Sequence, residues 1–242
     1  MLQGYYSAAS GMSAALQNQD ILSQNLAHAP VPGYRRQTLS FEEFVASQSA
    51  AKDPTSSQQL HGANIAKHSS SFDAGAYQKT GNPLDCAIQG DGFFVIDGPD
   101  GPLYTRNGQF QINADGQLVS PSGYPVMGSG GPLQIPSNAA QIQIAMDGTV
   151  SADNTQVGQL RVVSFNDPNQ LVRAGTTLFS APDDVTPQTS TATIRQGYRE
   201  GSNVSVIQEM VQMISGMRQY EAASKALHSL SDAMQQRING QM

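Results

Sequence analysis

The chain has 242 residues, a formal net charge of −6 at pH 7, no tryptophan and a charged fraction of only 13%. Soluble domains typically contain about 25% charged residues, so this surface has few solubilising groups and suits a protein that neighbours largely cover. The acidic balance argues against nucleic acid as a partner, because phosphate binding requires a basic face. The single cysteine, Cys86, excludes an internal disulfide and a cysteine-rich zinc site, and we interpret it as a small buried hydrophobe.

Residues 1–30 are expected to form an N-terminal helix, since segment 2–28 contains no proline and its apolar residues recur at helical spacing. This stripe consists of Tyr5, Ala9, Met12 and Leu16, with Leu22 and Leu26 further on. The helix should end before Pro30, which disfavours helical geometry in the preceding residue. The N-terminus lacks the basic and apolar regions of a cleaved signal peptide. No apolar run reaches the ~20 residues that cross a bilayer, so we expect no membrane insertion.

Residues 31–82 are expected to form an extended connector. Segment 46–80 is rich in Ser, Gln, Ala, Lys and Gly and poor in apolar residues. Such a composition cannot bury enough apolar surface to form a core of its own. The sequence therefore predicts at most short strands here, such as one around Asn64-Ile65.

Residues 83–196 are expected to form an antiparallel all-β domain followed by a return linker. Short apolar runs alternate with turn dipeptides such as Asp91-Gly92, Asn107-Gly108 and Asp147-Gly148, which supply the positive φ that tight hairpins require. The alternation of polar and apolar residues predicts half-buried strands. These strands are expected at Phe93–Ile96, Gln109–Ile112, Gln117–Val119, Tyr124–Met127, Leu133–Ile135, Gln141–Ala145 and Gln159–Phe165, with a last one near Thr193–Gln196.

Residues 197–242 are expected to contain a second, longer helix over 203–240, with Ser202 or Asn203 as its N-cap. Steps of three and four residues give a mostly apolar seam. Its members are Val206, Met210, Met213, Met217, Tyr220, Ser224, Leu227, Ser231, Met234 and Ile238. The fold class predicted from all segments is α+β, in which the N- and C-terminal helices pair as a coiled coil and the antiparallel all-β domain lies between them in sequence.

The sequence contains no arrangement that indicates catalysis. Four histidines lack a second ligand at metal spacing, and no Gly-x-Ser-x-Gly elbow is present. The glycine cluster over 128–132 lacks the lysine of a phosphate-binding loop, and the Asp-Gly pairs lack the spacing of calcium loops. We therefore expect a protein that is not an enzyme, with no catalytic residues, no cofactor and no metal.

Two readings of function follow from these features alone. Terminal helices that each need a helical partner, together with a weakly charged surface, favour a protein that assembles with copies of itself. A secreted enzyme or adhesin with a β domain and a helical stalk is the alternative, and the missing catalytic pattern argues against the enzyme.

Three groups of motifs, in this order along the chain, resemble the axial proteins of the bacterial flagellum, the rod and hook family. The first group is Ser10-Gly11-Met12, Asn18-Gln19-Asp20, Ser23–Ala27 and Pro32–Gln37; the second is Pro83–Asp85, Ala87–Phe94, Tyr104–Gly108 and Asp115–Leu118; the third is Gly197-Tyr198, Glu200–Val204, Met213-Ile214, Arg218, Tyr220-Glu221 and Lys225. His28 stands where an Asn is commoner. The connector length, the cluster over 128–132 and Gly201 resemble proximal-rod members more than distal-rod or hook-type members.

The resemblance implies a structural subunit of the basal-body rod, a hollow drive shaft in the periplasm that also passes exported subunits. It implies export without a cleaved signal peptide by the flagellar export apparatus. The partners it implies are copies of this chain and other rod and hook proteins, with basal-body ring proteins as further candidates. The expected assembly interface comprises Tyr5, Met12, Leu16, Leu22, Leu26, Tyr34, Arg35, Val206, Met210, Met213, Met217, Tyr220, Leu227, Met234 and Ile238.

Overall fold

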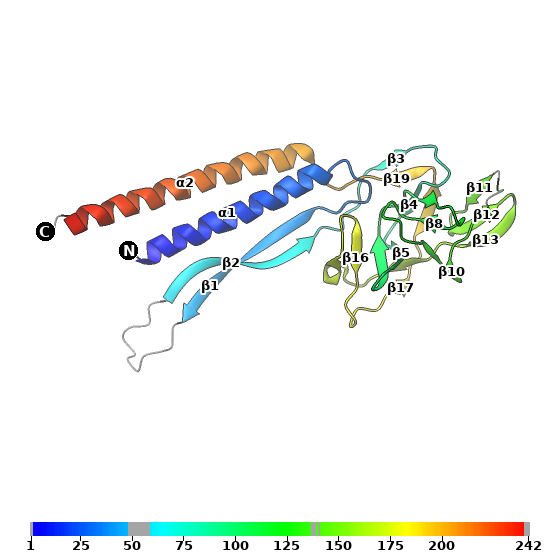
Figure 1. Ribbon diagram of the computed structural model, residues 1–242, viewed down its shortest axis with the longest axis horizontal. Helices are drawn as coiled ribbons and strands as arrows, with labels where there is room; N and C mark the ends of the chain where they lie inside the picture. The colour runs from blue at the N-terminus through cyan, green and yellow to red at the C-terminus, as the bar shows by residue number, and fades with distance from the viewer. Residues whose placement is uncertain (1, 48–58, 137–138, 140, 240–242) are drawn as a thin grey trace. The chain divides into compact units, whose positions relative to one another are not determined.

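The computed structural model describes residues 2–47, 59–136, 139 and 141–239, and for part of these only the backbone. The chain divides into two compact units, each of which is formed by segments that are distant in sequence (Figure 1). Unit 1 consists of Met1–Ala27, Gln37–Ser70 and Ser205–Met242. Unit 2 consists of His28–Arg36 and Ser71–Val204.

Unit 1 contains the two helices and one long pair of strands. Helix α1 spans Leu2–His28 and α2 spans Val206–Asn239, so α2 begins three residues later than the expected start at residue 203. The side-chain amide of Asn25 donates to Glu209 Oε2 at 3.2 Å, which joins the end of α1 to the first turns of α2. An N-terminal helix, an antiparallel β-rich middle and a C-terminal helix confirm the α+β class. No helix in the described part of the chain is long and apolar enough to cross a bilayer.

The strands of unit 1 correct the expectation of at most short strands in the connector. β1 (Gln37–Ser47) and β2 (Gln59–Ser70) pair antiparallel along their whole length, with one register shift after Ser40. The polar composition of β2 misled the sequence reasoning, because every residue except proline can join a ladder through its backbone whatever its side chain is. The partner strand β1, which precedes β2 in the chain, supplies that ladder.

Unit 2 is a β structure in which every paired strand is antiparallel. Its largest sheet has the order β15-β16-β6-β5-β14-β17, and a second sheet has the order β11-β12-β13. The remaining pairs are β9 with β10, β4 with β18, β3 with β19 and β7 with β8. The pairings of β4 with β18 and of β3 with β19 bring the end of unit 2 back to its beginning.

The strands of unit 2 are short. In chain order they are β3 (Tyr77–Lys79), β4 (Cys86–Gln89), β5 (Phe93–Gly98), β6 (Gly101–Thr105), β7 (Gln111–Ile112), β8 (Leu118–Val119), β9 (Met127–Gly128), β10 (Gly131–Pro132), β11 (Ile142–Ile144), β12 (Thr149–Ala152), β13 (Thr155–Gln159), β14 (Val162–Ser164), β15 (Val172–Arg173), β16 (Leu178–Ser180), β17 (Gln188–Thr189), β18 (Thr193–Gln196) and β19 (Tyr198–Glu200). A single 3-10 turn, η1 (Pro168–Gln170), interrupts them among the described residues. The expected strand at 133–135 is absent, although Leu133 and Ile135 are buried.

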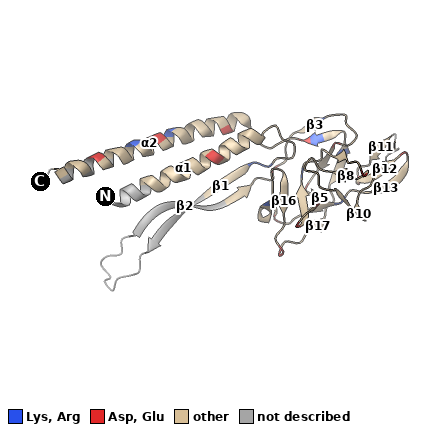
Figure 2. Cartoon of the chain, viewed as in Figure 1, with Lys and Arg blue, Asp and Glu red and all other residues tan. Residues whose placement is uncertain are grey.

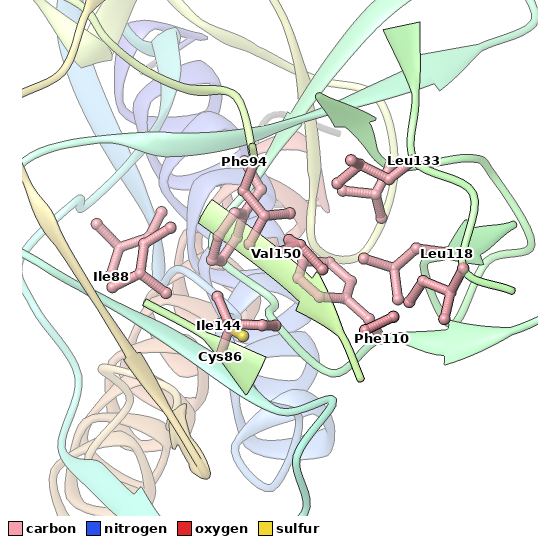
Figure 3. Packing of buried hydrophobic residues seen from close by; sticks show 13 residues of the cluster. Cys86, Ile88, Phe94, Phe110, Leu118, Leu133, Ile144 and Val150 are labelled. Atoms are coloured by element: carbon pink, nitrogen blue, oxygen red, sulfur yellow. The ribbon is translucent and has the colours of Figure 1, made fainter. Parts of the chain in front are cut away.

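Strand β5 divides two hydrophobic clusters. Successive residues of a strand point to opposite faces of its sheet, and Phe94 accordingly joins the larger cluster while Phe93 and Val95 join the smaller one. The larger cluster includes Phe110, whose ring meets that of Phe94 edge to face at 5.0 Å between centroids (Figure 3). Both clusters lie wholly in unit 2, so this unit has a core of its own.

Cys86 is buried in the larger cluster (Figure 3), and its chemistry gives the first prediction. Burial raises the pKa of this thiol to about 12, and Asp85 adds to the effect. The folded state therefore keeps a proton that the unfolded state loses above about pH 9, so unfolding becomes more favourable as the pH rises from 9 towards 12. We expect a thiol reagent at pH 8 to modify Cys86 only when unit 2 unfolds.

The matched variant for this prediction is Cys86→Ala. Burial also raises the pKa values of Tyr77 and Tyr104, so part of the alkaline loss of stability belongs to those tyrosines. The variant should keep their contribution and lose that of the thiol, which makes its stability decline less steeply with pH. Rapid labelling of Cys86 in the native protein would contradict the prediction. So would a free energy of unfolding that declines equally steeply with pH in the native chain and in Cys86→Ala.

Candidate functional site

The three motif groups that were distant in sequence meet inside unit 2 at Glu200. Arg35 comes from the segment after α1, Arg106 follows β6, and Glu200 ends β19. The Glu200 carboxylate accepts from Arg35 Nη2 at 2.6 Å and from Arg106 Nη1 at 3.4 Å. The backbone N–H of Gly75 donates to the same carboxylate at 3.0 Å. One buried carboxylate therefore holds four segments of unit 2 together.

The charges of this cluster do not balance. Both Arg35 and Glu200 have 0% of their side chains exposed, and Arg106 is also buried. Burial lowers the pKa of Arg106, while the nearby Glu200 carboxylate opposes that shift. Arg35 Nε, Arg35 Nη1 and Arg106 Nε have no hydrogen-bond partner in the described part of the chain. Glu200 is thus the counter-charge on which two buried guanidinium groups depend.

Glycine is required where the segment after α1 crosses this cluster. Gly33 has φ of +70°, a left-handed conformation that favours glycine. A Cβ at this position would lie 2.4 Å from the backbone nitrogen of Asn107. The N–H of Gly33 donates to the carbonyl oxygen of Glu200 at 2.8 Å. The Pro32-Gly33 turn of the sequence motif is therefore a close backbone contact with the two other motifs.

Arg173 covers the same segment through its flat guanidinium group. This group lies 5.0 Å from the ring centroids of both Tyr34 and Phe179, a geometry that favours cation–π attraction. Its Nη2 also donates to the carbonyl oxygen of Arg35. Tyr34 and Arg35, which the sequence places on the assembly interface, are fully buried within unit 2 and offer no surface to a neighbour in this conformation.

Two asparagine side chains join segments that are separate in sequence, one in each unit. In unit 2, Asn203 accepts from the N–H of Arg36 at 2.7 Å and donates to the carbonyl oxygen of Ser71 at 2.9 Å. In unit 1, Asn25 accepts from the N–H of Gln37 at 2.8 Å and donates to the carbonyl oxygen of that residue at 2.9 Å. Each asparagine supplies the donor and acceptor that a neighbouring backbone would supply.

The least exposed face of α2 differs from the predicted seam over the first half of the helix. Glu209 and Gly216 are buried, and Met213 and Tyr220 are half-buried. These positions are three and four residues apart, as a helical seam requires. The hydrogen bond to Asn25 fixes Glu209 on this face, and Gly216 lies two turns further along the same face. Glu209 and Gly216 therefore lie on the buried face of α2, where the sequence predicts Met210 and Met217.

Because the buried face of α2 is rotated about the helix axis relative to the predicted seam, bulky apolar side chains of α2 remain exposed. We define the α2 ridge as Val206, Ile207, Met210, Val211, Ile214 and Met217, whose exposed fractions are 41%, 76%, 48%, 62%, 54% and 44%. Charged residues are sparse on α1, whereas α2 carries charges of both signs, none of them in the α2 ridge (Figure 2). An apolar strip of this kind on a surface helix is typical of a site for a binding partner.

The remaining predicted interface residues lie in different environments. Leu22 is buried, Met12, Leu26 and Leu227 are half-buried, and Leu16 is 47% exposed. The side chains of Tyr5, Met234 and Ile238 lie outside the described part of the chain. Sequence reasoning missed Ile207, Val211 and Ile214, because it followed a single seam and did not consider a second face of the same helix. Glu200 and Arg106 lie in the sequence motifs, but nothing in the sequence indicates their role.

A molecule whose long helices keep exposed apolar faces and whose buried charges tie its own segments together has the character of a structural assembly protein. Family models match three parts of the chain: the flagella basal body rod protein over residues 6–35, the flagellar hook protein FlgE/F/G D1 domain over residues 87–152 and the flagellar basal body rod FlgEFG protein C-terminal region over residues 195–240.

Relatives match over nearly the whole chain. A flagellar basal-body rod protein FlgG of Buchnera aphidicola is 34% identical, with 99% of each chain covered. Rod proteins named FlgF from Salmonella typhimurium and Mesorhizobium japonicum are 32% and 30% identical, with 94% and 98% of this chain and 93% and 97% of their own length covered. The chain belongs to the flagellar basal-body rod protein family, and it is a structural rod protein and not an enzyme.

The comparisons place the chain within this family without choosing between FlgG and FlgF, since relatives of both names have similar identities. The rod relatives also do not favour the adhesin alternative. Among the described residues, no group of three or more His, Cys, Asp or Glu side chains is placed to hold a metal ion.

Proposed function

We propose that this rod subunit polymerises helically through its two terminal helices into a hollow shaft that transmits torque and passes exported subunits. The observation that carries the proposal is the α2 ridge, six large apolar side chains that unit 1 leaves 41% to 76% exposed. Exposed apolar area on this scale is costly in water and favourable to bury against a neighbour. The low charged fraction of 13% agrees with a surface that other subunits cover.

The proposal includes a coiled-coil pairing of α1 with α2 along the assembled shaft. The contact between Asn25 and Glu209 supports it at one point, and the heptad spacing of Glu209, Met213, Gly216 and Tyr220 supports it along α2. The proposed interface comprises the residues predicted on the two helices together with the α2 ridge. The proposed parts of the chain remain 1–30 and 197–242 for the shaft core, 31–82 for the connector and 83–196 for the outer domain.

We also propose a place in the proximal rod. The alignments with several FlgG relatives extend over 262 positions, more than the 242 residues of this chain, whereas an alignment with a FlgF relative extends over 242 positions. The FlgG relatives therefore contain residues that this chain lacks, in agreement with the longer connector expected of distal-rod members.

The family resemblance supports the rest of the assignment. We propose a periplasmic position, export through the flagellar export apparatus without a cleaved signal peptide, and contacts with other rod and hook proteins and with basal-body rings. Fractionation of the cell tests the periplasmic position. Comparison of the exported chain's N-terminus with the gene-encoded one tests the export without a cleaved signal peptide.

Removal of residues 205–242 tests the proposal directly. The deletion takes away α2 and leaves unit 2 whole, because unit 2 ends at Val204. We expect the shortened chain to keep the strand content and the buried thiol of unit 2 and to be absent from purified basal bodies, where the full chain is present. A shortened chain that enters basal bodies at the normal level would show that α2 is not required.

A further inference from the structure

We propose that the α2 ridge of one copy packs against the exposed face of α1 of a second copy, so that the contact between copies is heterologous. The inference rests on the proposed function, since it names the partner surface for the helices that are proposed to assemble. A heterologous contact joins two different patches of one chain, and it produces open helical arrays when the rotation between copies does not close.

The α2 ridge has the form of a row of knobs. Val206, Met210 and Ile214 follow one another at intervals of four residues, and Ile207 and Val211 form a parallel row beside them. Rows at this interval are the ridges that fit into the grooves of another helix. The ridge covers the part of α2 from 206 to 217, which is about 17 Å long at 1.5 Å per residue.

The exposed face of α1 offers a matching groove. We define the α1 outer face as Ala9, Ser13, Leu16, Asp20, Ser23 and Ala27, all of which are exposed. Their spacing alternates between four and three residues, which is the spacing of a helix that faces another helix along its length. Four of the six are Ala or Ser, so the backbone of α1 is accessible to large side chains from a second helix. This face extends for about 27 Å and is long enough for the whole ridge.

The charged residues of the two helices also favour a contact between α2 of one copy and α1 of a second copy. Asp20 is the single carboxylate of α1 and lies in the middle of the α1 outer face. At the end of the α2 ridge, Arg218 is exposed, and Glu221 and Lys225 lie four residues apart, in the order that favours pairing with each other on one helix. Arg218 is then the cation that remains for a carboxylate on another chain, and Asp20 of the second copy supplies it.

Self-pairing of two ridges fits these residues less well. Large side chains would meet large side chains without grooves to receive them, and an in-register parallel pair would place Arg218 beside its own copy, which is unfavourable. A symmetric pair would also use the ridge completely at two copies and end growth there.

Disulfide trapping in basal bodies tests the proposal. The bacterium that encodes the chain produces two differently tagged forms of the full chain, one with Ile214→Cys and one with Ser23→Cys, and purified basal bodies are oxidised. Because α1 and α2 are antiparallel within a subunit, an Arg218–Asp20 pair between copies places Ile214 near Ser23. Cys86 is buried and does not interfere. We expect a cross-linked dimer that carries both tags. The matched control replaces Ile214→Cys by Gln219→Cys, which is exposed on another side of α2 and should reduce the cross-link at least fivefold.

The outcomes separate this inference from the proposed function. Basal bodies that contain both chains but give only dimers of the Ile214→Cys form, or no dimers, overturn the heterologous contact and leave the proposed function intact. Absence of the unmodified chain from basal bodies overturns the proposed function and the inference with it. If the cysteine forms do not assemble, Asp20→Arg and Arg218→Asp are each expected to lower incorporation and together to restore it, and a double variant no better than the single ones overturns the proposal.

Discussion

Replacement of Glu200 by alanine should lower the free energy of unfolding of unit 2 by about 3–5 kcal/mol, because breaking a buried ion pair on one side leaves an uncompensated buried charge. Here two guanidinium groups lose their counter-charge, since Arg35 and Arg106 both donate to this carboxylate. The N–H of Gly75 loses its acceptor as well. A loss of this size is a large fraction of the ~5–15 kcal/mol that stabilises a typical domain.

Urea unfolding at pH 7 measures the effect, with the reactivity of the Cys86 thiol as the probe because that thiol is buried in unit 2. Glu200→Gln keeps the shape and one acceptor oxygen and removes the charge, so its loss should lie between those of the native chain and Glu200→Ala. The control is Asp183→Ala, which removes an exposed carboxylate of the same unit and should change stability by less than about 0.5 kcal/mol. Equal effects of the alanine substitutions at 200 and 183 would refute the role given to Glu200.

The Glu200 cluster shows where sequence reasoning reaches its limit. The motifs that contain Arg35, Arg106 and Glu200 were each visible, but the pairing of Arg35 with Glu200 spans 165 positions of the chain. Local spacing carries no information about such a contact. Two charged residues with opposite sign in separate motifs are usually solvated, and burial decides between these possibilities only when the fold is known.

The fold itself was predictable where local chemistry determines it. The turn dipeptides placed β5 within two residues of its observed bounds, because Asp-Gly pairs determine where a hairpin turns. The pairing of β1 with β2 was not predictable, since β2 is polar and residues 48–58 separate it from β1 without a turn dipeptide that indicates a hairpin. The rotation of α2 was missed because Glu209 and Gly216, which hydropathy assigns to the surface, are the buried positions.

Substitution of Ile214 by aspartate should abolish incorporation into rods while leaving the folded subunit almost unchanged. Ile214 is 54% exposed in the α2 ridge, and aspartate has nearly the same helix propensity as isoleucine, so the isolated chain has little to lose. Assembly would bury the new carboxylate in an apolar contact without a partner, which costs several kcal/mol at every subunit. Because each subunit repeats the contact along a polymer, we expect at least a hundredfold less rod protein in basal bodies and loss of motility.

The matched control is Gln219→Asp, which adds the same charge at an exposed position of α2 outside the ridge. Circular dichroism and urea unfolding should give the same curves for both variants and the native chain, and only Ile214→Asp should fail to assemble. Met213 and Leu227 are less suitable for this test, because they are half-buried within the subunit and a charge there also affects unit 1 itself. Normal rods built from Ile214→Asp would mean that the exposed apolar side chains of α2 do not become buried on assembly, and the physical basis for polymerisation through this helix would be lost.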